Sequence, residues 1–146
     1  MHSGLMIRST LLIAMALQAS QPPDADLWQE CQIESATLCG PGGCKSVEPT
    51  LKLYLGDYRA DDGRRAGYYY RCRRGGECDI IENPWIGEGM GYRAFVMREQ
   101  GVISRIGPDS RITDVATIED TVLISRGSCW NADRPRIRRV VPPTRN

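Results

Sequence analysis

Apolar and polar residues alternate with a period of two along most of the chain. Residues 51–55 show the pattern most clearly, because three leucines there alternate with a lysine and a tyrosine. Successive side chains of a β-strand point to opposite faces of a sheet, so this alternation predicts a half-buried strand. Similar segments bounded by turn-forming residues predict further strands at 27–33, 68–72, 79–82, 92–97, 102–106, 111–118 and 121–126.

These segments together predict the fold class. No segment of ten residues shows helical spacing of its apolar positions, and turn signals separate the short strands at regular intervals. This organisation is typical of a small antiparallel β-barrel or sandwich, so we expect one all-β domain of about seven to eight short strands over 27–130. Its core is expected from aliphatic residues of the strands, namely Leu51, Leu53, Leu55, Val96, Ile103, Ile112, Val115, Ile118, Val122 and Ile124.

The N-terminal segment is typical of a secretory signal peptide. Arg8 precedes the apolar run 11–17, and the small residues Ala19 and Ser20 follow it. The run is much shorter than the roughly 20 residues that a helix needs to span a bilayer, so we expect no transmembrane segment. We predict a signal peptide over 1–19, a linker over 20–26, and export to a periplasm or out of the cell. The alternative is an apolar N-terminal helix that stays attached and packs.

Six cysteines follow this segment, and an even number in a small exported chain predicts a disulfide framework. Sequence alone allows many pairings, but loop geometry favours one set. One pair of cysteines flanks a Gly-Gly sequence that can reverse the chain, and another pair flanks a second tight, glycine-rich loop. The last pair would then join the first structured segment to the last. The expected disulfides are Cys72–Cys78, Cys39–Cys44 and Cys31–Cys129.

A four-cysteine zinc site in a chain that is not exported is the alternative interpretation of the segments 39–44 and 72–78. These segments supply two cysteine pairs with four and five intervening residues, 27 residues apart. Structural zinc sites prefer two to four intervening residues, and thiols of exported proteins are normally oxidised, so we favour disulfides. The chain has no Cys-x-x-Cys motif of the kind found in thioredoxin-like redox sites. We therefore expect no metal and no cofactor.

The composition argues against catalysis. The only histidine, His2, lies in the predicted signal peptide, so the exported chain lacks the side chain most often used for general base catalysis near pH 7. Carboxylate pairs such as Asp61–Asp62 fall in turns, where acids are ordinarily solvated. The segment Gly87–Gly91 is followed by a strand rather than a helix, so we expect a flexible loop or β-bulge, not a phosphate-binding loop. We predict no catalytic residues and no enzymatic activity.

Four residues are candidates for a binding surface, namely Trp85, Tyr92, Arg71 and Arg73. Trp85 lies before a glycine-rich segment, and we favour packing over one end of the barrel above the alternative, an exposed contact residue. In residues 68–74, arginine and tyrosine occupy both faces of one strand. Such side chains can bind sugars, single-stranded nucleic acid or an acidic protein surface, but stacking on one another along the sheet is the favoured interpretation.

The formal charge of +1 is unevenly distributed along the chain. Residues 134–146 hold five arginines and no acid, so a mildly acidic body carries a basic tail. We expect a disordered tail over 131–146, and the alternative is docking to an anionic envelope component through Arg134, Arg136, Arg138 and Arg139. Arginine makes up 17 of the 19 basic residues, which we attribute to codon bias, so we do not expect nucleic acid as a partner.

Three functions of different classes remain. The favoured one is a non-enzymatic binding protein of the cell envelope, whose partner is an envelope component or another exported protein. The second is an inhibitor of an exported hydrolase. The expected architecture is similar to that of small disulfide-bonded β-barrels that inhibit lysozyme in the bacterial periplasm, but their Ser-Ala-Ser-Gly-type inhibitory loop is not present around residues 89–92. The third is an enzyme that uses carboxylates.

Overall fold

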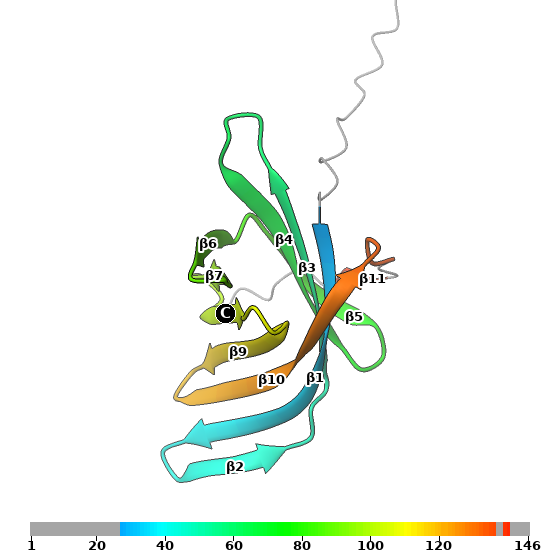
Figure 1. Cartoon of the computed structure of the whole chain (residues 1–146). Helices are drawn as coiled ribbons and strands as arrows, with labels where there is room; N and C mark the ends of the chain where they lie inside the picture. Colours follow the sequence, from blue (N-terminus) through cyan, green and yellow to red (C-terminus); the bar gives the residue numbers. More distant parts are fainter. Residues whose placement is uncertain (1–26, 137–138, 141–146) are drawn as a thin grey trace, which may run out of the picture.

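The computed structural model describes residues 27–136 and 139–140, which form an all-β fold (Figure 1). The predicted all-β, disulfide-bonded fold class is confirmed. The predicted signal peptide and linker, with Arg138, lie outside the described residues. The strands are β1 (Leu27–Gly40), β2 (Gly43–Val47), β3 (Leu51–Arg59), β4 (Arg65–Arg73), β5 (Glu77–Glu82), β6 (Trp85–Gly89), β7 (Tyr92–Met97), β8 (Val102–Ile106), β9 (Arg111–Ile118), β10 (Thr121–Ala132) and β11 (Arg139–Val140).

One curled sheet contains all of these strands. Its order is β11-β5-β4-β3-β1-β10-β9-β8-β7-β6, and β2 pairs with β1 outside this path. The sheet bends into a half-barrel, so that β7 approaches β4 across the interior (Figure 1). The rings of Tyr69 on β4 and Phe95 on β7 lie 6.3 Å apart between centroids. The described strands outnumber the expected seven to eight because three segments for which we predict no strand, 43–47, 85–89 and 139–140, also pair as strands.

Three disulfides fasten this sheet, and each joins residues that face each other on paired strands. The bonds are Cys31–Cys129, Cys39–Cys44 and Cys72–Cys78, the same pairs that loop geometry favours. The described residues include no free cysteine, so no thiolate is left for the zinc site considered above. Among them, no group of three or more His, Cys, Asp or Glu residues could hold a metal ion. Three disulfides are compatible with an exported protein.

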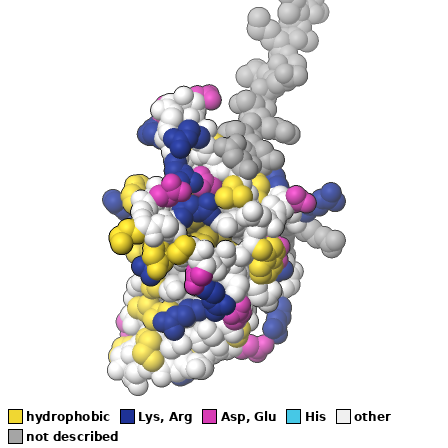
Figure 2. Space-filling view, viewed as in Figure 1, with side chains coloured by type: hydrophobic (Ala, Val, Ile, Leu, Met, Phe, Trp, Pro, Cys, Tyr) yellow, Lys and Arg dark blue, Asp and Glu magenta, His cyan; other side chains and the backbone are white. Residues whose placement is uncertain are grey.

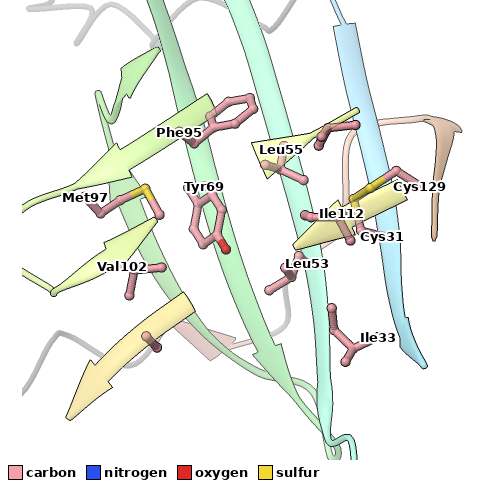
Figure 3. Close-up of a cluster of buried hydrophobic side chains, with 12 residues drawn as sticks. Cys31, Ile33, Leu53, Leu55, Tyr69, Phe95, Met97, Val102, Ile112 and Cys129 are labelled. Atoms are coloured by element: carbon pink, nitrogen blue, oxygen red, sulfur yellow. A yellow bond between two sulfur atoms is a disulfide. The ribbon is translucent and has the colours of Figure 1, made fainter. Parts of the chain in front are cut away.

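The main core lies inside the half-barrel. Tyr69 is fully buried and lies among the aliphatic side chains of β3, β7 and β8 (Figure 3). Complete burial of one large apolar side chain contributes about 1.5–3 kcal/mol to the free energy of folding. The buried members of this core are Cys31, Ile33, Leu53, Leu55, Tyr69, Phe95, Met97, Val102, Ile106, Ile112, Ala116 and Cys129.

The predicted core was partly wrong. Three of its residues are buried, but Ile103 and Ile118 are exposed. Strand β8 shows the reason for this error. It has apolar residues on both faces, so alternation alone does not show which face is buried. Ser104 faces inward, where its hydroxyl donates to the Asp114 carboxylate, so Ile103 faces outward. The half-buried remainder is Leu51, Val96, Val115, Val122 and Ile124.

A second cluster of aromatic residues covers the outer face of β1, β3 and β4. Trp28 stacks on Tyr68 with ring centroids 5.8 Å apart, and its ring lies 5.3 Å from that of Tyr70. A Cβ atom at Gly56 would come within 2.9 Å of the Trp28 ring, so β3 needs a glycine there. Tyr68 and Tyr70 thus pack on the sheet surface, whereas Tyr69 between them points into the core.

The C-terminal tail is not wholly separate from the sheet. Strand β10 continues to Ala132, beyond the expected end of the domain at residue 130. The backbone of Arg139–Val140 pairs in parallel with Glu77 and Cys78 of β5. An edge strand such as β5 presents unpaired backbone groups, which accept this short addition. These two residues therefore contribute backbone to the sheet.

Candidate functional site

Exposed large hydrophobic side chains concentrate on one surface of the half-barrel. Of the six among the described residues, four lie on β6, β7, β8 and the turn between β6 and β7. Figure 2 shows hydrophobic side chains gathered over β6 and β7. The exposed fractions are 60% for Trp85, 96% for Met90, 40% for Tyr92 and 52% for Ile103. We call these four residues with Arg105 the hairpin surface. Contiguous exposed patches of this kind mark interaction sites, whereas scattered single residues do not.

The tip of the β6–β7 hairpin is a two-residue turn at Met90 and Gly91. Both residues have positive φ angles, 52° and 77°, as the right-handed twist of tight hairpins favours. Glycine, asparagine and aspartate adopt this conformation most readily, and other residues in it cost about 1 kcal/mol. Met90 adopts it while almost completely exposed, so the methionine side chain gains no packing inside this chain. The expected flexible loop at Gly87–Gly91 is instead the end of β6 and this turn.

Trp85 lies flat against the outer face of β6. A Cβ atom at Gly87 would come within 2.3 Å of Cη2 of Trp85, so the indole ring lies directly over this glycine. One face of the ring is therefore supported by the sheet, and the side chain remains more than half exposed. The structure places Trp85 on an outer face rather than over one end of the sheet, where we favoured placing it.

Tyr92 is held under Arg105 on the same outer face. The guanidinium carbon of Arg105 lies 4.4 Å from the Tyr92 ring centroid. Such a cation–π contact contributes about 0.5–1 kcal/mol at an exposed site. The ring is also in contact with the backbone at Gly107, where a Cβ atom would approach Cε1 of Tyr92 within 3.2 Å. The arginine thus keeps its charge at the surface and fixes the orientation of the ring.

The inner side of the same hairpin carries a cluster of ion pairs. Arg93 Nη1 lies 3.2 Å from Asp57 Oδ2, and Arg93 also donates to the side-chain oxygen of Gln29. Arg65 bridges Asp57 and Glu88. Burial lowers the pKa of Arg93, and the nearby Asp57 carboxylate opposes that effect. The hydrogen bond from Arg65 lowers the pKa of Glu88. We call these five residues the ion cluster; it ties β6 and β7 to β1, β3 and β4.

A hollow of about 500 Å³ lies beside the ion cluster. Its walls include Gln29, Glu88, Tyr92 and Arg93, with backbone at Gly107. The carboxylates here are already paired with arginines, and each arginine has an acidic partner. The cluster is therefore a support that holds the hairpin surface in place, because mutually paired charges attract an external ion only weakly.

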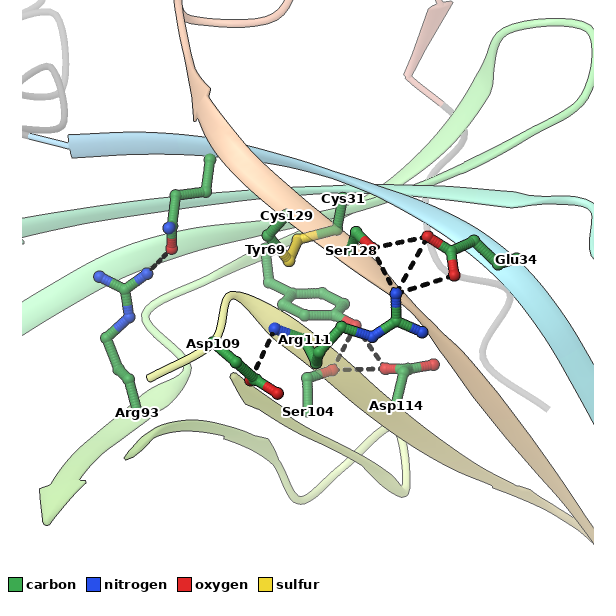
Figure 4. The surroundings of a disulfide bond; sticks show 11 residues. Cys31, Glu34, Tyr69, Arg93, Ser104, Asp109, Arg111, Asp114, Ser128 and Cys129 are labelled. Atoms are coloured by element: carbon green, nitrogen blue, oxygen red, sulfur yellow. Dashed lines mark hydrogen bonds and ion pairs between the residues drawn. A yellow bond between two sulfur atoms is a disulfide. The ribbon is translucent and has the colours of Figure 1, made fainter. Parts of the chain in front are cut away.

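A second polar network lies in the core, and Figure 4 shows its members Tyr69, Ser104 and Asp114. The Tyr69 hydroxyl donates to Asp114 Oδ1 at 2.5 Å and lies 2.6 Å from Ser104 Oγ, and Ser104 donates to the same carboxylate. Arg71 Nη2 completes it, 3.1 Å from Asp114 Oδ2. Burial and the Asp114 charge raise the pKa of Tyr69 well above its ordinary value, so its hydroxyl keeps its proton. Arg71, an expected surface contact, thus points inward and neutralises a buried acid.

Arg73 lies apart from the hairpin surface. It lines a different hollow, of about 640 Å³, between the β2–β3 connection and the β4–β5 turn. Arg73 Nη2 is 3.1 Å from Asp79 Oδ2, so this cation already has an acidic partner. Two more of the basic side chains around the hollow are likewise paired, with Glu30 and Glu48. The basic residues of this hollow are Lys52, Arg73, Arg74 and Arg136.

The structure does not assemble the arginines proposed for envelope docking into one described site. Arg136 lines the larger hollow, and Arg134 follows the end of β10. Arg139 contributes backbone to β11, and Arg138 is outside the described residues.

Sequence reasoning missed Met90, Ile103 and Arg105. A two-residue connection between the segments 85–89 and 92–97 is a signal that could have identified the turn at Met90. No comparable signal distinguishes the outward-facing Arg105 from the inward-facing Arg71, since both lie in strands where polar and apolar residues alternate.

The sequence matches no protein-family model and shows no significant similarity to any curated protein. In the described part of the chain, no helix is long and apolar enough to cross a membrane.

Proposed function

We propose that this chain is an exported, non-enzymatic binding protein of the cell envelope, and that the hairpin surface contacts its ligand. The observation that carries the proposal is that four of the six exposed large hydrophobic residues among the described ones, Trp85, Met90, Tyr92 and Ile103, lie on β6, β7, β8 and the β6–β7 turn. Met90 adds weight, because an exposed apolar residue with positive φ is unfavourable for folding and is retained more easily where it serves binding.

The support beneath the surface favours binding over mere exposure. The ion cluster and the buried network fix β6–β9 to the body of the domain on the inner side. A surface held rigid before contact loses less conformational entropy on binding than a mobile loop does. The Trp85 and Tyr92 rings are also oriented by Gly87 and Arg105, so both are presented ready for contact.

The charge of the surface favours an anionic ligand. The outward positions of β6, β7 and β8 carry aromatic, aliphatic and small residues and one cation, Arg105. Glu88, the acid of β6, and Arg93 of β7 point to the inner side instead, where both belong to the ion cluster. A surface with this composition fits an envelope component that combines apolar contact area with negative charge.

Co-sedimentation of the purified, oxidised protein with isolated cell envelopes tests the proposal. We expect binding that weakens as salt rises and that falls about tenfold or more in the variant Trp85→Ala, since one large interfacial aromatic contributes about 2 kcal/mol or more. Trp130→Ala is the matched control, because Trp130 is exposed at 44% on β10 outside the hairpin surface. Equal binding by the two variants, or no sedimentation of the unaltered protein, would contradict the proposal. Inhibition of lysozyme that requires Met90 would favour the inhibitor function instead.

A further inference from the structure

The outer face of the sheet carries a row of residues that runs across the strands from β6 to β1. Each member is the direct register partner of the next, and partners in an antiparallel sheet point to the same face. Neighbouring strands lie about 4.8 Å apart, so two members separated by two strands are about 10 Å apart at the backbone. We call it the cationic row, and its members are Gly87, Ala94, Arg105, Thr113, Arg126 and Ser35.

Three groups of the cationic row that can contact a ligand, one aromatic ring and two arginines, lie two strands apart from one another. The Trp85 ring covers Gly87 at the β6 end. Arg105 follows two strands later, and Arg126 follows after two more. Between the arginines lies the hydroxyl of Thr113, so the row offers one aromatic face, two cations and a hydrogen-bonding group in a line. The spacing from one charged position to the next is about 10 Å.

A row of apolar residues runs parallel to the cationic row. Its members are displaced by two residues along each strand, which is about 7 Å. Ile103 is exposed, and the valines and isoleucine that continue the row are half-buried. The half-buried members therefore project little above the surface of the sheet. The apolar row consists of Trp85, Val96, Ile103, Val115 and Ile124.

Arg105 and Arg126 differ in their partners from five other strand arginines. Arg65, Arg71, Arg73, Arg93 and Arg111 each form an ion pair with a carboxylate. No carboxylate of the described residues pairs with Arg105, which contacts the Tyr92 ring, and none pairs with Arg126.

The described part of β6–β10 also places no acid at an outward strand position. The nearest acid in sequence to the end of the row, Glu34, is bonded to Arg111 and Ser128. The two arginines are therefore exposed without a neutralising carboxylate on the row.

We infer that the cationic row binds an acidic polysaccharide, lying across β6–β10 with its anionic groups on Arg105 and Arg126. The inference rests on the proposed function and names the ligand class of that surface. Sugar rings have apolar C–H faces and polar edges, so the Trp85 ring and the apolar row suit the faces. The arginines suit anionic groups that recur along an extended polymer, because the guanidinium group pairs carboxylates in a fixed, forked geometry.

The geometry favours a polysaccharide over an anionic bilayer. A face that enters a bilayer needs apolar side chains that project beyond its cations, as interfacial anchors do. Here the Trp85 ring lies flat over Gly87, and the aliphatic residues beside it are mostly half-buried. Charge and apolar area lie side by side in two narrow rows that follow the curl of the sheet, which matches a single polymer chain better than a broad, flat surface.

Binding of defined polymers to the purified, oxidised chain tests the inference. The probes are polygalacturonate as the acidic polysaccharide, dextran as the neutral one, and vesicles of phosphatidylglycerol with phosphatidylcholine, compared by calorimetry at low and physiological salt. We expect affinity for polygalacturonate that falls as salt rises, and no binding of dextran. The double variant Arg105→Gln/Arg126→Gln should weaken it tenfold or more, and Trp85→Ala by a similar factor.

A charge-matched control keeps this comparison specific. Lys45→Gln/Arg74→Gln also removes two positive charges, at an exposed position of β2 and at the larger hollow, and should change the affinity less than twofold. Far-ultraviolet circular dichroism and urea midpoints confirm that each variant is folded.

The outcomes separate the two proposals. Equal affinity of the two double variants, or binding to the vesicles but not to polygalacturonate, overturns the polysaccharide inference. If the protein sediments with envelopes in a Trp85-dependent manner but ignores polygalacturonate, the inference fails and the proposed function stands. If it binds neither envelopes nor any probe, both fail.

Discussion

Replacing Asp114 with alanine tests the network at the centre of the core. The change leaves the Arg71 side chain, only 14% exposed, without its counter-charge, and it removes the carboxylate that accepts from the hydroxyls of Tyr69 and Ser104. An uncompensated buried charge costs about 3–5 kcal/mol. We therefore expect the free energy of unfolding to fall by about 4 kcal/mol. Because a domain of this size is stable by about 5–15 kcal/mol, the variant should still fold in the absence of denaturant.

A second variant, Tyr69→Phe, tests whether the groups act together. It removes one donor but leaves Asp114 bonded to Ser104 and Arg71, so it should cost about 1.5–3 kcal/mol. In the Asp114→Ala background the tyrosine hydroxyl keeps only Ser104 Oγ as a partner, so its removal should cost about 0.5–1 kcal/mol. The two effects should thus be non-additive by about 1–2 kcal/mol.

Urea unfolding with the disulfides intact measures both quantities. Tryptophan fluorescence and far-ultraviolet circular dichroism should give coincident transitions, which licenses a two-state treatment. Asp120→Ala, in the exposed turn between β9 and β10, is the control and should change stability by less than about 0.5 kcal/mol. A loss of less than about 1 kcal/mol for Asp114→Ala, or additive effects in the double variant, would refute the assignment of this network as a coupled stabilising unit.

Three further predictions concern the framework, the hairpin surface and pH. The intact mass of the chain recovered from an oxidising export compartment should match an N-terminus near Ser20, with all cysteines alkylating only after reduction; earlier alkylation would contradict the disulfide framework. Gly87→Val should displace the Trp85 ring, which a Cβ atom would meet at 2.3 Å, and should lower envelope binding while the protein remains folded; unchanged tryptophan fluorescence would contradict the stacked geometry. Hydrogen bonds from Ser128 and Arg111 lower the pKa of Glu34, so its stabilising effect is present above the unfolded-state pKa and is lost as pH falls through the folded-state pKa. The stability difference between the unaltered protein and Glu34→Gln should therefore shrink on acidification, and a pH-independent difference in urea midpoints would count against it.

The fold class and the disulfide pairs could be predicted because they depend on local information. Period-two alternation requires only the residues within one strand, as in 51–55. Two disulfides close loops with sequence separations of 5 and 6, so their partners are set by the turns between them. The third pair then followed by elimination, although its cysteines lie 98 residues apart. None of these inferences needs to know which strand lies beside which.

The faces of the strands could not be predicted in the same way. Arg71 and Arg105 both lie in strands where polar and apolar residues alternate, and nothing in their own segments separates them. Arg71 points inward because it pairs in the core with Asp114, which lies 43 residues further along the chain. Arg105 turns outward because its strand neighbour Ser104 is drawn into that same network. The direction of each side chain therefore depends on the register of β9 relative to β8 and on the packing of both strands against β4, which is tertiary information.

This dependence also explains how one hairpin serves two roles. Along β7, the inward residues Arg93, Phe95 and Met97 bind the hairpin to the body of the domain, and the outward residues Tyr92, Ala94 and Val96 belong to the exposed face. Because a strand places neighbours on opposite sides, the contacts that stabilise the fold and the surface proposed for binding occupy alternate positions of the same segment. Substitutions at inward positions must lower stability and binding together, since they release the hairpin. Substitutions at outward positions can lower binding alone, so the two kinds of variant distinguish a recognition surface from a patch that is exposed without function.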